Sequence, residues 1–440
     1  MTTFRRLTSA ILAATLLSVS LRGQELRQIA ASDPYLDERA GLSLDQAIAR
    51  ALEQEPGLRA ARREVDVAGG QRQQADLHRN PTLTFERRME AGGTDRLTAV
   101  GVEWPLDLYR REGRVETAER ELVATRFEVA DRERMLAGDV RRQYGAAAAA
   151  ARDVSVADEL VAAVERQLDL ARARASEGAI PPLERDVLEV DVRRLQAERA
   201  RAAGRADVAM LQLKQLLGMS PDELLALGES LETLVRRTGP VGPDSSPASG
   251  RARADVRQAE ARVTLANARV EQAEREGRLD ISLVGTYMRM DAGFPQSGLG
   301  PSGVPERVRG QFNYVSAGAM IGLPLFNRNQ GDVARRQAER LGAEDRLEAA
   351  SLSARSEAAA ARARDVRAQE AVALYLGGTR TLARQNLDVV HQTFDLGRGT
   401  VFDVLAEQRR YLDFEQAYTA ALAEAWDARA SLKRALGDTK

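Results

Sequence analysis

"VEWPLDLYRREGRVETAE" occupies residues 102–119, and "IGLPLFNRNQGDVARRQAE" occupies residues 321–339. Each stretch passes from apolar residues into a proline, Pro105 or Pro324, and then into a charged sequence of helical composition. Proline tolerates the end of a strand because it has no N–H to donate to a central ladder. Both stretches therefore predict a corner where a strand ends and a long helix begins, once in each half of the chain.

The composition of the 440-residue chain favours long helices, since Ala, Leu, Glu and Arg dominate and only 4% of residues are aromatic. The net charge of −1 gives no footprint for nucleic-acid binding. The chain has no cysteine and only two histidines, which argues against disulfides, thiolate sites and an all-imidazole metal site. No nucleotide-binding glycine loop or Ser/His/Asp set is present. We therefore predict no catalytic, cofactor or metal site, and no enzymatic activity.

The first residues have the pattern of a secretory signal peptide. Arg5 and Arg6 precede the apolar run 7–21, so residues 1–23 are expected to form the leader and 24–41 an N-terminal extension. An amphipathic or anchoring helix is the alternative. No other stretch approaches 18 consecutive apolar residues.

The rest of the chain contains an internal tandem repeat. Leu58 and Val65 match Val256 and Val263 at an offset of 198 residues, and the two corner prolines are 219 apart. The extra residues fall in the Gly/Pro-rich stretch 291–310, which we expect to be a long loop. The repeats are expected at 42–237 and 253–440, joined by a linker at 238–252.

Each repeat has the same predicted order of elements: helix, β-hairpin, long helix, tip turn and returning helix. The hairpins are expected at 81–108 and 279–326, and the tip turns near residues 178 and 399. The long helices are expected at 109–175 and 331–396. Five glycines are candidate kink positions: Gly138, Gly145, Gly342, Gly377 and Gly378.

The predicted strands alternate with a period of two. Val100, Val102 and Trp104 share one face, as do Ile281, Leu283 and Tyr287 and a third set of Val315, Ala317, Ala319, Ile321 and Leu323. Hairpins covered by helices in a secreted, water-soluble protein would show the same alternation. Together with the leader, however, the pattern favours insertion into an outer membrane. Four strands cannot close a barrel, so subunits would have to share one.

Residues 42–437 of the chain resemble the TolC-like outer-membrane efflux family. The resemblance rests on the order and duplication of motifs: "LSLDQAIARALEQEPGLRAAR" (42–62), "RNPTLTF" (79–85), "WPLDLYRREG" (104–113), "LPLFNRNQG" (323–331) and "LGRGTVFDVLAEQRRYL" (396–412). The fourth motif is most similar to the CzcC-type heavy-metal efflux branch.

The resemblance implies a mostly α fold with a small β part. Long helical hairpins would form a trimeric α-barrel, continuous with a 12-stranded transmembrane β-barrel to which each chain gives four strands. It implies a homotrimer in the outer membrane of a Gram-negative bacterium, extending into the periplasm. The expected partners are outer-membrane lipid, a periplasmic adaptor and an inner-membrane resistance-nodulation-division pump.

The function so implied is a passive exit duct of a tripartite efflux system, with heavy-metal cations as candidate substrates and no cofactor. The alternative is a periplasmic coiled-coil adaptor or binding protein without a pore. By the same resemblance, the adaptor would contact the tip turns at Gly178, Ala179, Ile180, Gly397, Gly399, Thr400 and Val401.

An acidic entrance gate is expected at Asp403, with Glu407 beside Ala406 one turn further on. The competing interpretation of Asp403 is a solvated residue in the first turn of a helix, favoured there by the helix dipole. We expect His391 to be a lone exposed histidine. The arginine-rich runs 141–145 and 407–412 are expected on solvated helix faces.

Overall fold

The computed structural model describes residues 34–91, 93, 95–237 and 253–438. The chain divides into two compact units. The helical unit takes residues up to 60, 131–253 and those from 353 onward, and the sheet unit takes 61–130 and 254–352. Each unit thus draws on both halves of the chain. The predicted signal peptide, residues 24–33 of the predicted extension and the predicted linker 238–252 lie outside the described residues.

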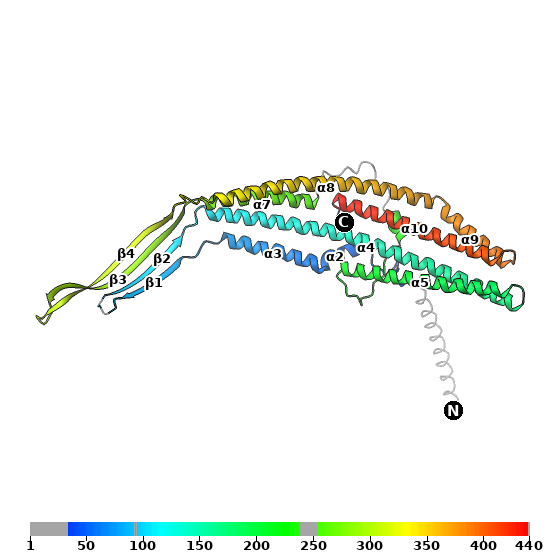
Figure 1. Ribbon diagram of the computed structural model, residues 1–440, viewed down its shortest axis with the longest axis horizontal. Coiled ribbons are helices and arrows are strands. Elements are labelled where there is room, and N and C mark those ends of the chain that lie inside the picture. The colour runs from blue at the N-terminus through cyan, green and yellow to red at the C-terminus, as the bar shows by residue number, and fades with distance from the viewer. Residues whose placement is uncertain (1–33, 92, 94, 238–252, 439–440) are drawn as a thin grey trace, which may run out of the picture. The chain divides into compact units, whose positions relative to one another are not determined.

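The sheet unit contains one antiparallel sheet in the order β1-β2-β3-β4 (Figure 1). The strands and the helices that precede the two hairpins are β1 (Thr82–Met89), β2 (Arg96–Pro105), β3 (Asp280–Leu299), β4 (Pro305–Gly322), α3 (Pro56–Asp76) and α7 (Ala254–Glu276). All four strands lie inside the ranges in which the sequence predicts hairpins.

The stretch 291–310 is not the long loop that the sequence predicts. β3 continues to Leu299 and β4 begins at Pro305, so only a short turn separates them, with Gly303 at φ +72°. The pairing register shifts between Gly293 and Ser297. An antiparallel ladder absorbs such a shift as a bulge, and a proline at the first position of a strand is tolerated. Glycine and proline therefore mark the bulge and the turn here, and the hairpin runs on past them.

The helical unit contains α2 (Leu44–Gln54), α5 (Pro182–Leu216), α6 (Leu231–Arg237), α9 (Thr379–Asp395) and α10 (Val401–Leu436). The single helix that the sequence predicts before the first hairpin is in fact two helices, α2 and α3, separated at Glu55. Glu55 has extended backbone angles, φ −63° and ψ 123°. Pro56 explains the break, because a residue before proline is pushed out of the helical region.

The two long helices differ from each other. α4 (Arg110–Ser176) is continuous for 67 residues and runs through Gly138 and Gly145 without a break. Both glycines make room for α10: an added Cβ at Gly145 would lie 1.9 Å from Cδ1 of Trp426. The second long helix does break at the predicted pair Gly377–Gly378, between α8 (Gln330–Leu376) and α9. Gly378 has φ +99°, which side-chain-bearing residues rarely adopt.

The core of the helical unit is built on the seams of the returning helices. On α10 five residues spaced seven apart are all buried: Val404, Tyr411, Tyr418, Ala425 and Leu432. On α5 the residues spaced seven apart from Leu188 are buried as far as Ala202, but Met210 and Leu217 then replace Ala209 and Leu216 in the core. A helix of 3.6 residues per turn drifts by about 20° per heptad, which moves the seam one position along.

An element that the sequence did not reveal closes the core near α2. Leu227 forms parallel bridges with Leu36 and Leu42, and the Asp37 amide donates to the Leu227 carbonyl at 2.8 Å. The short helix α6 follows directly and buries Leu231 and Leu234. Residues 34–41 of the predicted extension are thus an integral part of the helical unit.

Candidate functional sites on the sheet, at the corners and at the tip turns

In the part of the sheet nearer the corners, the register separates a mainly apolar face from a face of small and polar residues. Beyond Tyr287 the first face becomes polar, in the row Arg87, Thr98, Arg289 and Asn313. Phe85, Val100, Tyr287 and Val315 pair across the four strands in one row. Neighbouring rows on the same face contain Leu83, Val102, Trp104, Leu283, Ala317, Ala319 and Ile321. The predicted sets of strand residues therefore do lie on one face. A row of the opposite face consists of Thr84, Gly101, Thr286 and Ser316.

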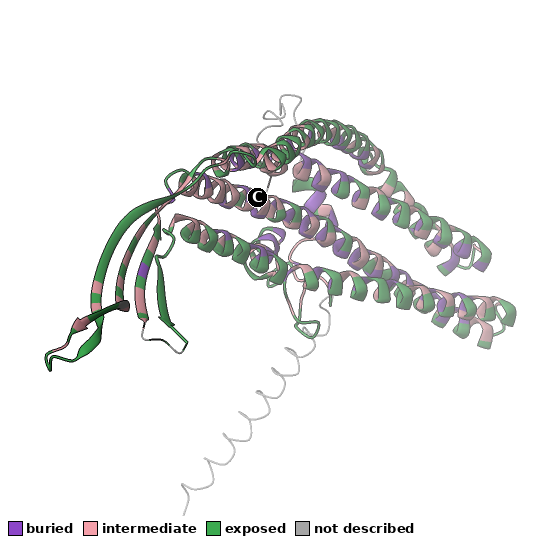
Figure 2. Cartoon of the chain, turned by 60° about the vertical axis from the view of Figure 1, so that its left-hand side comes forward, coloured by how far each residue is buried: buried purple, intermediate pink, exposed green. Residues whose placement is uncertain are grey.

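The apolar face is exposed on the single chain. Val315 is 84% exposed and Phe85 70%, and Figure 2 shows exposed residues along most of the sheet. Exposure of apolar surface costs about 25 cal/mol per Å² in water, and soluble monomers rarely leave a patch of this kind uncovered. The face therefore requires an apolar cover such as lipid.

Both corner prolines lie where the sequence places them. Pro105 is the last residue of β2 and Pro324 follows the end of β4 at Gly322. Each corner then contains one of the two non-glycine residues with positive φ in the described chain, Asp107 (φ 51°) and Asn329 (φ 62°). Asp and Asn enter this region more easily than other residues, since their short polar side chains can hydrogen-bond locally.

Side-chain contacts hold both corner residues. Arg114 donates to the Asp107 carboxylate at 3.0 and 2.5 Å, and Asn329 donates from Nδ2 to the Ala273 carbonyl at 2.8 Å. Burial by itself raises the pKa of Asp107, but the hydrogen bonds and charge of Arg114 outweigh it, so the pKa is lowered. Asp107 remains an anion locked to Arg114.

The two tip turns have the same backbone geometry. Gly178 (φ +74°) follows α4 and Gly397 (φ +73°) follows α9. In each turn the next amide donates back across the helix end, from Ala179 to the Arg174 carbonyl at 2.8 Å and from Arg398 to Thr393 at 3.0 Å. This is the Schellman arrangement that a glycine at the helix end permits.

Arg174 links one turn to the other, which the sequence did not predict. Its guanidinium donates to the carbonyls of Phe394 at 2.9 Å and Asp395 at 2.5 Å, and lies 5.4 Å from the centre of the Phe394 ring. The last carbonyls of α9 are thereby capped by a side chain of α4. The only sequence signal was an arginine in the last turn before a glycine.

The predicted tip contacts are not equally accessible. Gly178, Ala179, Gly397 and Thr400 are exposed, and Ile180 and Gly399 are partly buried. Val401 is fully buried, in a cluster with Phe394 and Val404. Val401 therefore supports the turn from beneath.

Asp403 is engaged in the cap of α10. Its carboxylate accepts hydrogen bonds from the Thr400 amide at 3.1 Å and the Thr400 hydroxyl at 2.6 Å, and its own amide donates to that hydroxyl. These bonds form a capping box and hold the pKa of Asp403 below its usual value. Glu407 lies one turn further along and pairs with Arg410 at 3.3 Å.

His391 is half-buried, so the prediction of an exposed histidine is wrong. Its Nε2 lies 3.2 Å from Nε2 of Gln408, which donates to Gln167 at 2.8 Å. Packing of α9 against α10 and α4 explains this placement, and burial lowers the pKa of His391. The runs 141–145 and 407–412 are only partly solvated, since each also contains buried side chains, namely Arg141, Tyr144, Gln408 and Tyr411.

A buried ionic cluster joins four helices of the helical unit. Glu415 of α10 accepts from Arg152 of α4 at 2.5 Å and from Arg380 of α9 at 3.1 Å, while Arg152 also donates to Glu232 of α6 at 2.5 Å. The Glu415 side chain is 1% exposed. Burial raises the pKa of Glu415, but both arginines outweigh it and the pKa is lowered.

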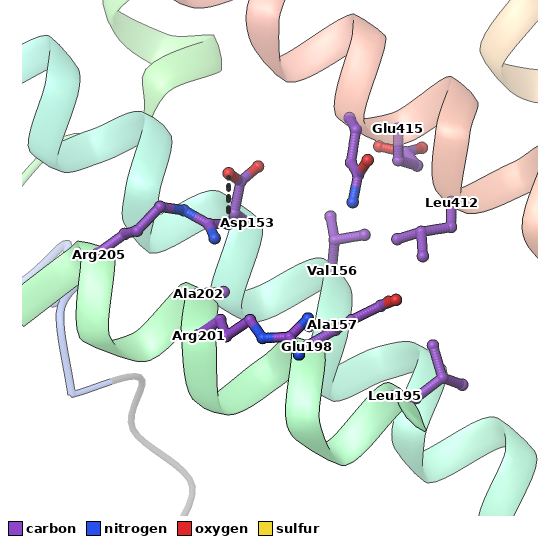
Figure 3. Close-up of a pocket in the computed structure, with 11 residues that line it drawn as sticks. Asp153, Val156, Ala157, Leu195, Glu198, Arg201, Ala202, Arg205, Leu412 and Glu415 are labelled. Atoms are coloured by element: carbon purple, nitrogen blue, oxygen red, sulfur yellow. Dashed lines mark ion pairs between the residues drawn. The ribbon is translucent and has the colours of Figure 1, made fainter. Parts of the chain in front are cut away.

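A cavity of about 210 Å³ lies beside this cluster, between α4, α5 and α10 (Figure 3). Asp153 faces it and pairs with Arg205 at 3.7 Å, and burial raises the pKa of Asp153. Among the described residues, no three His, Cys, Asp or Glu side chains come together in a way that could hold a metal ion. In the same part of the chain, every helix is too short or too polar to cross a bilayer.

Comparison with known proteins agrees with this geometry. The outer membrane efflux protein family matches residues 47–219 and 249–438. The cobalt-zinc-cadmium resistance protein CzcC of Cupriavidus metallidurans is 25% identical over 420 residues, 91% of each chain.

Two solved channels share the fold. CusC superimposes with a TM-score of 0.71 at 18% identity, covering 90% of this chain and 92% of its own. The Neisseria gonorrhoeae channel MtrE, in its open state, gives 0.71 at 20% identity over 90% and 88%. Since the family match spans most of the sequence, the chain belongs to the outer membrane efflux proteins.

Proposed function

We propose that this outer-membrane efflux protein works as a homotrimer. Three sheets of four strands would close a 12-stranded transmembrane β-barrel, continuous with an α-barrel formed by the helical hairpins. β1 and β4 are the two edges of the described sheet, and pairing them between subunits removes both edges. The observation that carries the proposal is the alignment of apolar rows on one face against Thr84, Gly101, Thr286 and Ser316 on the other.

The apolar rows are also of a suitable length. From Ile281 to Tyr287 they run roughly 20 Å along the strand at 3.3 Å per residue. Exposed Leu323 and Leu325 extend them at the corner. The apolar band of an outer-membrane barrel is about 25 Å tall.

Expression of the full chain in a Gram-negative host tests this proposal. We expect heat-sensitive oligomers of three chains in the outer-membrane fraction, and ion conductance when they are reconstituted in planar bilayers. A water-soluble periplasmic monomer without conductance would overturn the proposal in favour of the alternative, a coiled-coil adaptor or binding protein without a pore.

The tip turns are the proposed docking site for a periplasmic adaptor, which would connect the duct to an inner-membrane resistance-nodulation-division pump. The two turns expose matching backbone geometry, and Leu396 and Phe402 add exposed apolar side chains at the second turn. The pump would supply the energy, so the chain would need no catalytic site. Photo-crosslinkers at Ala179 and Thr400 should capture the adaptor in cells, whereas a crosslinker at exposed Leu352 on α8 should not.

Divalent heavy-metal cations are the proposed substrates, because the relative CzcC is named for cobalt, zinc and cadmium resistance. Deletion of the gene from its own host should lower tolerance to these three metals, and the intact gene should restore it. Unchanged metal tolerance together with increased sensitivity to organic drugs would contradict this substrate class.

A further inference from the structure

The sheet unit contains a cavity of about 550 Å³ at the two corners, which we call the corner pocket. It is bordered by segments that are far apart in the sequence. Its lining residues are Arg79, Arg110, Arg114, Glu276, Arg278, Asp280, Gly322, Leu323, Pro324, Asn327 and Asn329. Four arginines thus share the pocket with two carboxylates.

Two of the four arginines already have anionic partners. Arg114 holds the buried Asp107, and Arg110 donates to Asp280 at 2.8 Å. Neither Arg79 nor Arg278 forms a close ion pair with a carboxylate of the described residues, although the charge of Arg79 helps to lower the pKa of Asp107. Arg278 lies 5.8 Å from the centre of the Tyr109 ring. Four arginines therefore outnumber the three carboxylates of Asp107, Glu276 and Asp280 at the pocket, which leaves a net positive charge.

The helix starts at the pocket add to its positive potential. Arg110 and Arg114 belong to the beginning of α4, and Asn329 directly precedes α8. The first amides of a helix have no partner within the helix and attract anions. Arginine also matches the oxygens of a phosphate in a bidentate geometry.

The pocket also borders the apolar face. Leu323 and Pro324 line it, and Leu325 and Phe326, which follow immediately, are 65% and 92% exposed. If the sheet spans the membrane as proposed above, this end of it lies at the level of the lipid headgroups. Basic pockets at that level bind anionic headgroups.

We propose that the corner pocket binds the phosphate group of an anionic phospholipid at the periplasmic surface of the outer membrane. Arg79 and Arg278 contact the phosphate, and the acyl chains lie along the apolar side chains of the corner. This inference rests on the membrane-spanning arrangement of the proposed function, and it makes the corner a specific lipid site that fixes the depth of the sheet.

Native mass spectrometry of the purified trimer with added phosphatidylglycerol tests the site. The double variant Arg79→Gln/Arg278→Gln should bind this lipid at least about tenfold more weakly, as expected for loss of charge-assisted hydrogen bonds. Arg79→Lys/Arg278→Lys should retain intermediate binding. The matched control is Arg193→Gln/Arg409→Gln, which removes two exposed arginines from α5 and α10 and should bind like the unaltered protein.

Equal phosphatidylglycerol binding by the double variant and the control would overturn the proposal. Displacement of the lipid by inorganic phosphate at equal concentration would overturn the lipid source and leave a free-phosphate site. Conductance in planar bilayers separates this inference from the proposed function. A conducting trimer with unaltered lipid binding in the double variant rejects only the corner site, whereas absence of trimers and conductance rejects the duct itself.

Discussion

Asp403 caps a helix in the structure, and a second, electrostatic role at the channel entrance is proposed for it. Its carboxylate caps α10 through Thr400, and its negative charge lies close to the second tip turn. A change in gating on mutation could therefore come from either effect. Substitutions that remove the two properties separately can distinguish them.

Asp403→Asn removes the charge and keeps an oxygen that can accept from Thr400, whereas Thr400→Ala removes the cap and keeps the charge. If the charge narrows the entrance, single-channel recordings should show altered cation preference for Asp403→Asn and not for Thr400→Ala. Thr400→Ala should instead lower stability by about 1 kcal/mol, as loss of an N-cap does. Equal selectivity for Asp403→Asn and the unaltered protein would remove Asp403 from the gate.

Acidification should destabilise the helical unit through Glu415. The folded pKa of Glu415 is lowered, so its contribution to stability is complete above the unfolded value of about 4.3 and is lost as pH falls through the folded pKa. Thermal unfolding of the trimer, measured between pH 7 and pH 3, should show this decline. Glu415→Gln should flatten the decline and cost about 3–5 kcal/mol at pH 7, because it leaves Arg152 buried without this partner.

At the scale of elements, glycines inside helices have opposite roles. Gly145 of α4 lies against Trp426, while Gly204 of α5 has open space where a Cβ would be. Gly145→Ala should destabilise by about 1–3 kcal/mol through overpacking. Gly204→Ala should stabilise by about 0.5–1 kcal/mol, because alanine loses less backbone entropy in a helix. Urea unfolding measures the change in the free energy of unfolding for each variant. Equal changes for the two variants would contradict a close contact between Gly145 and Trp426.

The same glycines show how far the elements could be predicted. Strand alternation located β2 and the inner parts of β3 and β4, and the corner prolines located the ends of β2 and β4, because both signals are local. Whether a helical glycine bends the chain depends on its neighbour, and Trp426 lies 281 residues beyond Gly145. Composition could not show that α8 breaks at Gly377–Gly378 while α4 continues.

The residues of the candidate sites also fall into two groups, those that local sequence signals predict and those that only the folded chain brings together. The sequence located the tip glycines and Pro105 and Pro324, whose roles follow from backbone chemistry. It missed Arg174, the Glu415 cluster and the corner pocket, because each is assembled by residues more than 150 positions apart. The burial of Val401 and His391 was missed for the same reason, since burial depends on which helices meet.

At the scale of the whole molecule, the apolar face of the sheet decides where the protein can reside. Val315→Arg should lower the yield of heat-sensitive trimers in the outer membrane, because an arginine facing lipid is costly, by up to about 2–4 kcal/mol at the bilayer centre and less toward the edge of the apolar band. Ser316→Arg places the same side chain on the opposite face and should leave trimer yield much closer to normal. Similar yields for both variants would contradict the assignment of the faces.

The contacts of Arg174 have a consequence for the order of folding. Its hydrogen bonds reach carbonyls 220 and 221 positions further along the chain. During synthesis, the Arg174 guanidinium cannot form these hydrogen bonds until the residues that accept them have been made. Contacts between residues so far apart in the sequence slow folding. A truncated product that stops before residue 394 would still contain α4 and α5, but its first tip turn would lack the contacts of Arg174 with the second. We therefore expect proteases to cleave such a product early at that turn.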